Sequence, residues 1–255
     1  MDIKNCTAVI TGGASGLGEA CSRMFVENGG NAGVLDLNEE AGNRLTAELG
    51  DRAVYYQTNV ADEENVRHSI DQIYEKFGGI HFAVNCAGIG APRKVLSRKG
   101  TMPFDFFNQV IQINLIGTMT VIRLASEKMV LNEPNTDGEK GVIINTASVA
   151  AFEGQIGQAA YSASKAGVVG MTLPLAREFA EYGIRVVTIA PGLFNTPMMA
   201  GFSDEVKKSL EQQVPFPKRL GNPSEFSSLA RHIIMNPVIN GETIRIDGSI
   251  RMGIR

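Results

Sequence analysis

The chain has few of the residues that build disulfide frameworks and metal sites. Its 255 residues include three scattered cysteines, none in a CxxC pair (Cys6, Cys21 and Cys86). This argues against a disulfide framework or a zinc site and favours a reducing compartment. The three histidines are equally dispersed, which argues against a histidine-based hydrolase or a multi-histidine centre. We therefore expect no bound metal.

Strong charge bias and long apolar runs are also missing. Lys and Arg number 24 against 27 Asp and Glu, a net charge of −3, so bulk charge supports neither nucleic-acid nor membrane-surface binding. No apolar run reaches the roughly 18 residues of a membrane span. Because the opening MDIKNCTAVITGG already contains a strand-like run and a glycine pair, we expect no cleavable targeting segment and a cytoplasmic protein.

Glycine, by contrast, is abundant. The 28 glycines make up roughly 11% of the chain against a usual ~7%, without a collagen-like period. Hydrophobic residues at 44% and charged residues at 20% describe an ordinary globule with enough apolar material for a core. The excess of glycine indicates tight turns, or a backbone that approaches a ligand closely.

Short β-branched runs alternate with longer amphipathic stretches along the whole chain. The predicted strands are 7–11, 31–37, 53–60, 81–88, 141–147, 184–190 and 242–247. The predicted helices are 16–28, 39–49, 62–77, 104–131, 158–181, 203–213 and 223–235. This alternation predicts an α/β fold: a single doubly wound Rossmann domain over 1–255, with a parallel sheet of about seven strands and helices on both faces.

Two segments interrupt the alternation. Residues 89–103 form a long basic connection, and residues 191–223 carry five prolines. Both follow predicted strands, and ligands of open parallel sheets bind beyond the carboxyl ends of the strands. We expect these segments to wall a substrate cleft.

The first predicted strand runs directly into TGGASGLG at 11–18, followed by a helix. Gly12, Gly16 and Gly18 would let the backbone turn tightly and let a pyrophosphate approach the start of the helix, where free N–H groups favour anions. A plain glycine-rich turn is the alternative, but the flanking strand and helix favour dinucleotide binding.

An acidic residue ends the second predicted strand. Asp36 lies where a carboxylate can accept hydrogen bonds from the adenosine ribose, and its charge would repel a 2′-phosphate. This favours NAD over NADP, although a solvated carboxylate is the simpler alternative. Asn59 and Val60 end the third predicted strand and could frame the adenine.

Four further residues suggest proton chemistry. Tyr161 and Lys165 are four apart on a predicted helix and share one face, and a neighbouring ammonium would lower the phenol pKa. Ser148, just past the fifth predicted strand, could hold a substrate oxygen. Asn114 lies mid-helix, an unfavourable place unless its side chain has another role. A surface ion pair, a turn serine and a buried polar contact are the alternatives.

Taken together, these motifs resemble the classical short-chain dehydrogenases/reductases. The resemblance rests on TGGASGLG (11–18), NCAG (85–88), Asn114, Ser148, YSASK (161–165) and APG (190–192). It implies an Asn114–Ser148–Tyr161–Lys165 catalytic set and a homotetramer, often paired through two long helices. It also implies cofactor contacts beyond those above, namely Ser15, Leu17, Cys86, Ala87, Gly88, Tyr161, Lys165, Pro191, Gly192, Phe194 and Thr196.

Within that family, the chain resembles the 3-hydroxyacyl-CoA dehydrogenase type 2 group. This resemblance rests on four segments, 141–167, 188–198, 213–226 and 240–252. That group, also called type 10 17β-hydroxysteroid dehydrogenase, uses NAD to oxidise 3-hydroxyacyl-CoA thioesters and acts secondarily on hydroxysteroids. The resemblance implies that Ser148, Tyr161 and Gln155 contact an acyl-CoA. Asn59 departs from the group, which has Asp before Val60.

Several alternatives share these motifs. An alcohol or hydroxysteroid dehydrogenase would differ only in the cleft, and a 3-oxoacyl-carrier-protein reductase usually prefers NADPH, against which Asp36 argues. A catalytically silent NAD-binding scaffold is a different class, against which the intact four-residue set argues. The basic run RKVLSRK (93–99) could attract the phosphates of coenzyme A, or it could be a solvated loop.

Overall fold

The computed structural model describes residues 1–90, 92–199 and 203–254. Seven parallel strands form one sheet in the order β3-β2-β1-β4-β7-β8-β9. These strands are β1 (Thr7–Thr11), β2 (Asn31–Asp36), β3 (Ala53–Gln57), β4 (Phe82–Asn85), β7 (Gly141–Thr146), β8 (Ile184–Pro191) and β9 (Thr243–Ile246). The predicted parallel α/β sheet is therefore confirmed.

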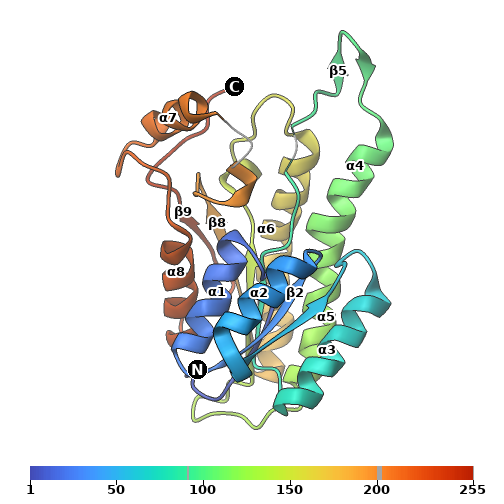
Figure 1. Ribbon diagram of the computed structural model, residues 1–255, viewed down its shortest axis with the longest axis vertical. Coiled ribbons are helices and arrows are strands. Elements are labelled where there is room, and N and C mark those ends of the chain that lie inside the picture. Colours follow the sequence, from blue (N-terminus) through green and yellow to red (C-terminus); the bar gives the residue numbers. More distant parts are fainter. Residues whose placement is uncertain (91, 200–202, 255) are drawn as a thin grey trace.

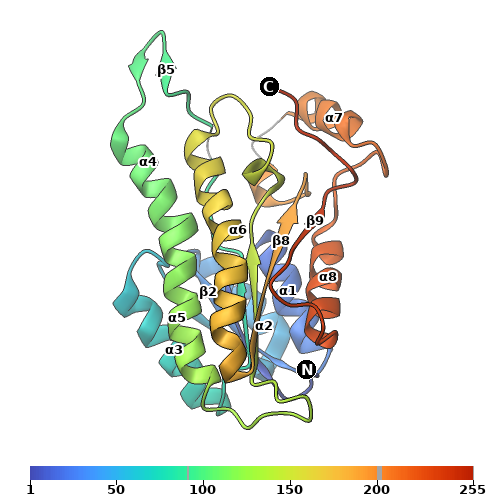
Figure 2. The same ribbon diagram turned by 180° about the vertical axis from the view of Figure 1, so that it is seen from behind.

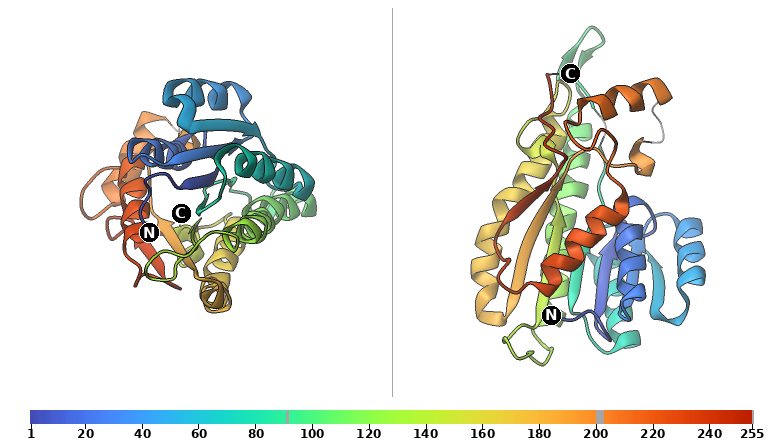
Figure 3. Two further views of the ribbon diagram at one scale, coloured as in Figure 1. Left: turned by 90° about the horizontal axis from the view of Figure 1, so that it is seen from below. Right: turned by 90° about the vertical axis from the view of Figure 1, so that its left-hand side faces the viewer.

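Helices cover both faces of the sheet (Figure 3). One layer contains α1 (Gly16–Glu27), α2 (Glu39–Leu49) and α8 (Pro223–Met235), and the other contains α3 (Glu63–Phe77), α5 (Gly117–Met129) and α6 (Ala159–Phe179). The central strands β1, β4, β7 and β8 are buried along their whole length. Their continuous apolar sequences reflect this coverage on both faces.

The helix predicted over 104–131 is not regular. It consists of α4 (Phe104–Ile111), a π-helical turn (Gln112–Ile116) and α5, which together form one long column beside α6 (Figure 2). Asn114 lies in the middle of the π-helical turn, and its backbone carbonyl accepts a hydrogen bond from the Thr118 hydroxyl at 2.8 Å. Such turns are frequent at functional sites.

The two irregular segments lie at one end of the molecule. Part of 89–103 forms an antiparallel hairpin, β5 (Leu96–Ser97) with β6 (Gly100–Thr101), where the sequence predicted only a connection. This hairpin and α7 (Asp204–Gln213) project at the end to which the strands point (Figures 1 and 2). Among the described residues, no helix combines the length and apolar character needed to cross a membrane.

Candidate active site

The glycine-rich loop after β1 contacts the chain segments that follow two other strands. Gly12 and Gly16 have φ angles of 61° and 53°, which other residues rarely adopt. A Cβ on Gly12 would lie 2.9 Å from the backbone nitrogen of Ala87, after β4, and a Cβ on Gly16 would lie 3.3 Å from Thr196, after β8. The loop is therefore held between these two segments, and Gly18 packs back on Gly12.

The start of α1 offers unpaired backbone donors at this loop. Ser15 occupies the N-cap, and its side chain makes no capping hydrogen bond. The N–H groups of the first turn, including those of Gly16 and Leu17, have no intrahelical partner because of their position. Together with the helix dipole, they can bind a phosphate group. This loop thus suits the pyrophosphate of a dinucleotide.

Asp36, at the end of β2, lies beside the same loop. Its Oδ2 accepts a hydrogen bond from the backbone nitrogen of Ala14 at 3.1 Å, and its Oδ1 accepts one from Asn38 at 3.0 Å. The carboxylate is only half-buried. It is therefore fixed next to the glycine loop with its charge accessible to a ligand.

Asn59 and Val60 make local contacts. The Asn59 backbone nitrogen donates to Asn65 Oδ1 at 2.7 Å, and its side-chain oxygen accepts from Ala61 at 3.1 Å. Val60 is buried against Gly117 of α5. Because β3 ends at Gln57, both residues lie beyond the strand that was predicted to carry them.

The residues predicted after β8 are placed in different surroundings. Pro191 ends the strand, and the Gly192 nitrogen donates to Ile246 at 3.0 Å. Phe194 is buried with its ring against Gly221, whereas Thr196 lies against Gly16. Of these four, Thr196 is the residue that contacts the glycine loop directly.

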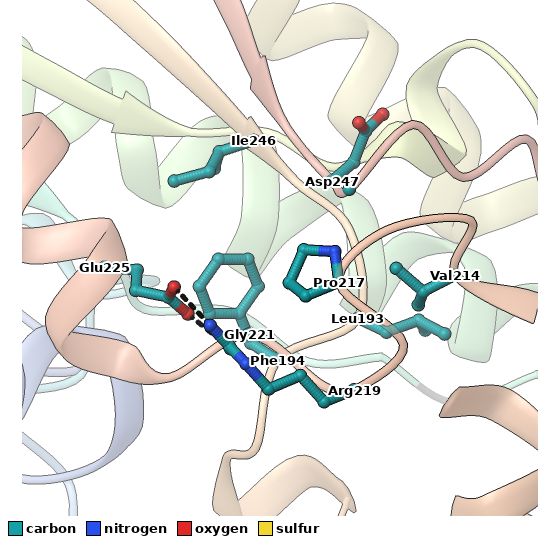
Figure 4. A pocket seen from close by; sticks show the side chains of 10 residues that line it. Leu193, Phe194, Val214, Pro217, Arg219, Gly221, Glu225, Ile246 and Asp247 are labelled. Atoms are coloured by element: carbon teal, nitrogen blue, oxygen red, sulfur yellow. Dashed lines mark hydrogen bonds and ion pairs between the residues drawn. The ribbon is translucent and has the colours of Figure 1, made fainter. Parts of the chain in front are cut away.

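Phe194 also lines a cavity of about 130 Å³ (Figure 4). Its walls come from the segment after β8 and from the end of β9, and an Arg219–Glu225 ion pair with an N–O distance of 2.8 Å closes one side. None of the four candidate catalytic residues lines this cavity. The segment 191–223 therefore does form a hollow, but one separate from the proton-transfer residues.

Asn114 joins the segment after β4 to helix α6. Its side-chain oxygen accepts from the Ile89 nitrogen at 2.8 Å, and its amide donates to the Ile89 carbonyl at 2.9 Å. The same amide donates to the Ser164 hydroxyl at 3.1 Å, and Ser164 in turn donates to the Tyr161 carbonyl at 2.7 Å. The completely buried side chain of Asn114 therefore fixes the position of α6 near Tyr161.

Ser148 and Tyr161 face each other across the site. Ser148 follows β7 and caps a short helical turn, where its Oγ accepts from the Ala150 nitrogen at 3.1 Å. Burial raises the pKa of the Tyr161 phenol, and a hydrogen bond from Ser148 offsets part of this rise. The expectation that a neighbouring ammonium lowers this pKa is wrong, because the effect of burial dominates and raises it.

Lys165 lies one helical turn beyond Tyr161, with its Nζ 5.8 Å from the centre of the phenol ring. The ammonium donates to the Thr146 carbonyl at 2.7 Å. Burial lowers the pKa of Lys165 to about 8. A Cβ on Gly88 would lie 3.6 Å from Nζ and 3.2 Å from Asn114 Oδ1, so all four candidate catalytic residues and the NCAG segment meet in one place.

Cys86, after β4, contacts Thr146 and Cys21. Its sulfur accepts a hydrogen bond from the Thr146 hydroxyl at 3.4 Å. Hydrogen bonding from Cys21 lowers the pKa of Cys86 and, reciprocally, raises that of Cys21.

Sequence reasoning missed Thr146 and Ser164. Thr146 acts through its carbonyl, which no side-chain pattern can reveal, and Ser164 lies within YSASK without a distinguishing signal of its own.

Gln155 lies in the loop between Ser148 and Tyr161, where its backbone nitrogen donates to Gln158 Oε1 at 2.9 Å. Within the described ranges, no group of three His, Cys, Asp or Glu residues could hold a metal ion.

Known proteins are similar to this chain along most of its length. A family model described as short chain dehydrogenase matches residues 6–207. The 3-hydroxyacyl-CoA dehydrogenase type-2 of Homo sapiens is 51% identical over 98% of this chain and 97% of that protein. The protein of the same name from Drosophila melanogaster is 50% identical over 98% of this chain and 99% of its own.

A solved structure is similar over the full length. The crystal structure of 3-hydroxyacyl-CoA dehydrogenase type-2 from Mycobacterium avium covers 100% of both chains with a TM-score of 0.94 and 39% identity.

Proposed function

Because this chain belongs to the short-chain dehydrogenase family, we propose that it is an NAD-dependent 3-hydroxyacyl-CoA dehydrogenase of fatty acid metabolism. It would interconvert the 3-hydroxy and 3-oxo groups of an acyl-CoA. The observation that carries the chemistry is the placement of Tyr161 one helical turn from buried Lys165, whose Nζ lies 5.8 Å from the centre of the phenol ring, with Ser148 close enough to lower the pKa of the phenol. The substrate class comes from the relatives, which are similar over nearly their whole length.

The family uses a nicotinamide cofactor, and the residues around the glycine loop suit NAD. The free N–H groups of α1 would bind the pyrophosphate, and Asp36 would accept hydrogen bonds from the adenosine ribose. A 2′-phosphate about 4 Å from this carboxylate would be opposed by roughly 4 kcal/mol at an effective dielectric constant of 20. Asp36 is thus the residue that favours NAD over NADP.

The protein's own residues would handle the proton. When bound, NAD supplies the hydride acceptor, or in reduced form the donor, for the substrate carbon. Tyr161 accepts the hydroxyl proton in oxidation and returns it in reduction, while Ser148 holds the substrate oxygen. Because the pKa of Tyr161 is raised, the phenol is protonated at neutral pH and is ready to act as the acid in reduction. Lys165 and Asn114 fix the position of α6 in the site through their hydrogen bonds to the Thr146 carbonyl and to the Ser164 hydroxyl.

The basic hairpin supports recognition of coenzyme A. Lys94, Arg98 and Lys99 are exposed before β5 and in the turn between β5 and β6, on a chain whose net charge is −3. The hairpin projects at the end to which the strands point (Figure 2). Clustered cations attract phosphates, so this hairpin would bind the nucleotide part of the substrate.

A substrate comparison tests the proposal. NADH oxidation is followed with acetoacetyl-CoA, acetoacetyl-carrier protein, a keto-steroid and a truncated acetoacetyl thioester that lacks the nucleotide. We expect the highest kcat/KM with acetoacetyl-CoA. Neutralising Lys94, Arg98 and Lys99 together should raise KM for the CoA ester and leave KM for the truncated thioester nearly unchanged. A higher kcat/KM on the steroid or the carrier protein would overturn the substrate assignment.

We also propose a cytoplasmic homotetramer. Exposed apolar side chains lie along the column of α4 and α5 and on neighbouring α6, namely Phe104, Ile116, Met119 and Leu173, and such surfaces suit subunit contacts. All three cysteines are free thiols, which suits a reducing compartment. Sedimentation of the purified protein would report the oligomeric state.

A further inference from the structure

The loop between Ser148 and Tyr161 is joined to the last strand of the sheet by a charged pair. Glu153, in this loop, accepts two parallel hydrogen bonds from Arg245 of β9, at 2.7 and 2.9 Å. Such bidentate pairs fix orientation as well as distance. The Arg245 side chain is 22% exposed and that of Glu153 is 26% exposed, so solvent screens the pair only in part.

Arg245 is itself held in place by its other neighbours. Its Nε donates to Asp247 Oδ2 at 2.7 Å, and one terminal nitrogen also donates to the Ile250 carbonyl at 3.1 Å. The guanidinium lies over the ring of Phe152, 5.4 Å from its centre. The loop thus contacts an arginine whose orientation is already determined.

The residues after β9 contact the same loop a second time. Arg251 lies 3.4 Å from Glu153 and 3.2 Å from Asp247. The Ile156 nitrogen donates to the Ile254 carbonyl at 3.0 Å, and the end of the chain passes beside this loop (Figure 2).

The loop in turn packs against the start of α6, which carries Tyr161. A Cβ on Gly154, the residue after Glu153, would lie 3.1 Å from the Cβ of Ser162. The backbone nitrogen of the next residue, Gln155, donates to the side chain of Gln158, which is the N-cap of α6. A shift at Glu153 would therefore move the backbone that supports the first turn of α6.

From these contacts we propose that Arg245 is a positioning residue, which holds the 152–158 loop so that Tyr161 stays aligned with Ser148 and the substrate. The inference rests on the proposed function, because alignment matters only if Tyr161 exchanges a proton with the substrate. Arg245 itself touches none of the four candidate catalytic residues in the contacts described above. Its effect on catalysis is transmitted through Glu153 and the loop.

A double-mutant cycle with Glu153→Gln and Arg245→Gln tests this role. Each single variant should lower kcat/KM for acetoacetyl-CoA about tenfold, and the double variant should be no worse than either one, because the two residues act as a unit. The dissociation constant of NADH should stay within about twofold of wild type, since the loop lies on the side of the site away from Asp36.

The matched control is Arg23→Gln, which breaks a similar pairing of Arg23 with Glu19 and Glu48 on α1 and α2. It should leave kcat/KM unchanged. Hydrogen–deuterium exchange of the peptide covering 149–160 gives a readout independent of activity. Exchange there should rise in both Glu153 and Arg245 variants but not in the control, and it should not rise throughout the protein.

Three results would overturn the proposal: additive losses in the cycle, wild-type kinetics in the single variants, or exchange that rises equally in all peptides. If wild type fails to reduce acetoacetyl-CoA, the proposed substrate is wrong. The cycle is then run with the carbonyl compound that wild type does reduce, and the exchange experiment needs no substrate at all.

Discussion

Lys165 should destabilise the protein in the absence of ligands. Its side chain is only 5% exposed, and burial lowers its pKa from 10.5 to about 8. A depression of this size corresponds to roughly 3 kcal/mol at neutral pH, where the ammonium must be kept charged in a poorly solvated place. This cost indicates that Lys165 has a function, because an apolar residue at this position would give a more stable protein.

The substitution Lys165→Met removes the charge while keeping a long unbranched side chain. It also leaves the Thr146 carbonyl without the hydrogen bond at 2.7 Å, which costs about 1–3 kcal/mol. The net expectation is a gain of about 1 kcal/mol in the free energy of unfolding and, for a chain of this length, a Tm higher by roughly 2–4 °C. Turnover should be lost in the same variant.

The stability difference between wild type and Lys165→Met should depend on pH. Below pH 8 the lysine is charged in both the folded and unfolded states, so the full cost applies. Between pH 8 and 10.5 the unfolded chain binds the extra proton, so wild-type stability rises with pH relative to Lys165→Met. Urea unfolding at pH 7 and pH 10 should show the variant's advantage shrinking. A variant that is less stable at pH 7, with a difference that does not change by pH 10, would refute the reasoning.

Two further substitutions probe the cofactor side of the site. Asp36→Asn keeps an acceptor for the Ala14 nitrogen but removes the charge. The KM for NADPH should therefore fall at least about tenfold, and the KM for NADH should rise. Unchanged KM values would show that Asp36 does not select the cofactor. Gly88→Ala would place a Cβ against Asn114 and Lys165 and should lower kcat/KM about tenfold, with a loss of about 1–3 kcal/mol in the free energy of unfolding from overpacking. Its control is Gly170→Ala on α6, where a Cβ meets nothing within 4 Å, and equal activity of the two variants would contradict the close approach.

Much of the sheet was predictable because its strands are buried on both faces. The runs at 7–11 and 141–147 lack the alternating polar positions of a half-exposed strand. The observed β1 and β7 match these runs within one residue. The third strand was predicted too long. Thr58 is buried and its nitrogen still donates to the Asp36 carbonyl of β2 at 3.0 Å, but the nitrogen of the next residue, Asn59, bonds to the Asn65 side chain instead of to a strand.

The structure brings the four predicted catalytic residues into one place, but the sequence could not report their environment. Asn114 stood out as a polar residue in a helical pattern, but the π-helical turn depends on the bonds to Ile89 and Ser164, which are distant in sequence. The raised pKa of Tyr161 depends on burial, which a one-turn spacing to Lys165 cannot report. The Glu153–Arg245 pair joins residues 92 positions apart, and no local pattern indicates it.

The central claim is that Tyr161 exchanges the proton with an acyl-CoA substrate, and Tyr161→Phe tests it most directly. The phenylalanine ring keeps the packing of Tyr161 and removes the hydroxyl that would exchange the proton. We expect kcat for acetoacetyl-CoA reduction to fall by about 10²–10⁴, while the dissociation constant of NADH, measured by fluorescence, stays within a few-fold of wild type. A Tyr161→Phe variant that binds NADH normally and retains near-wild-type kcat would contradict the account.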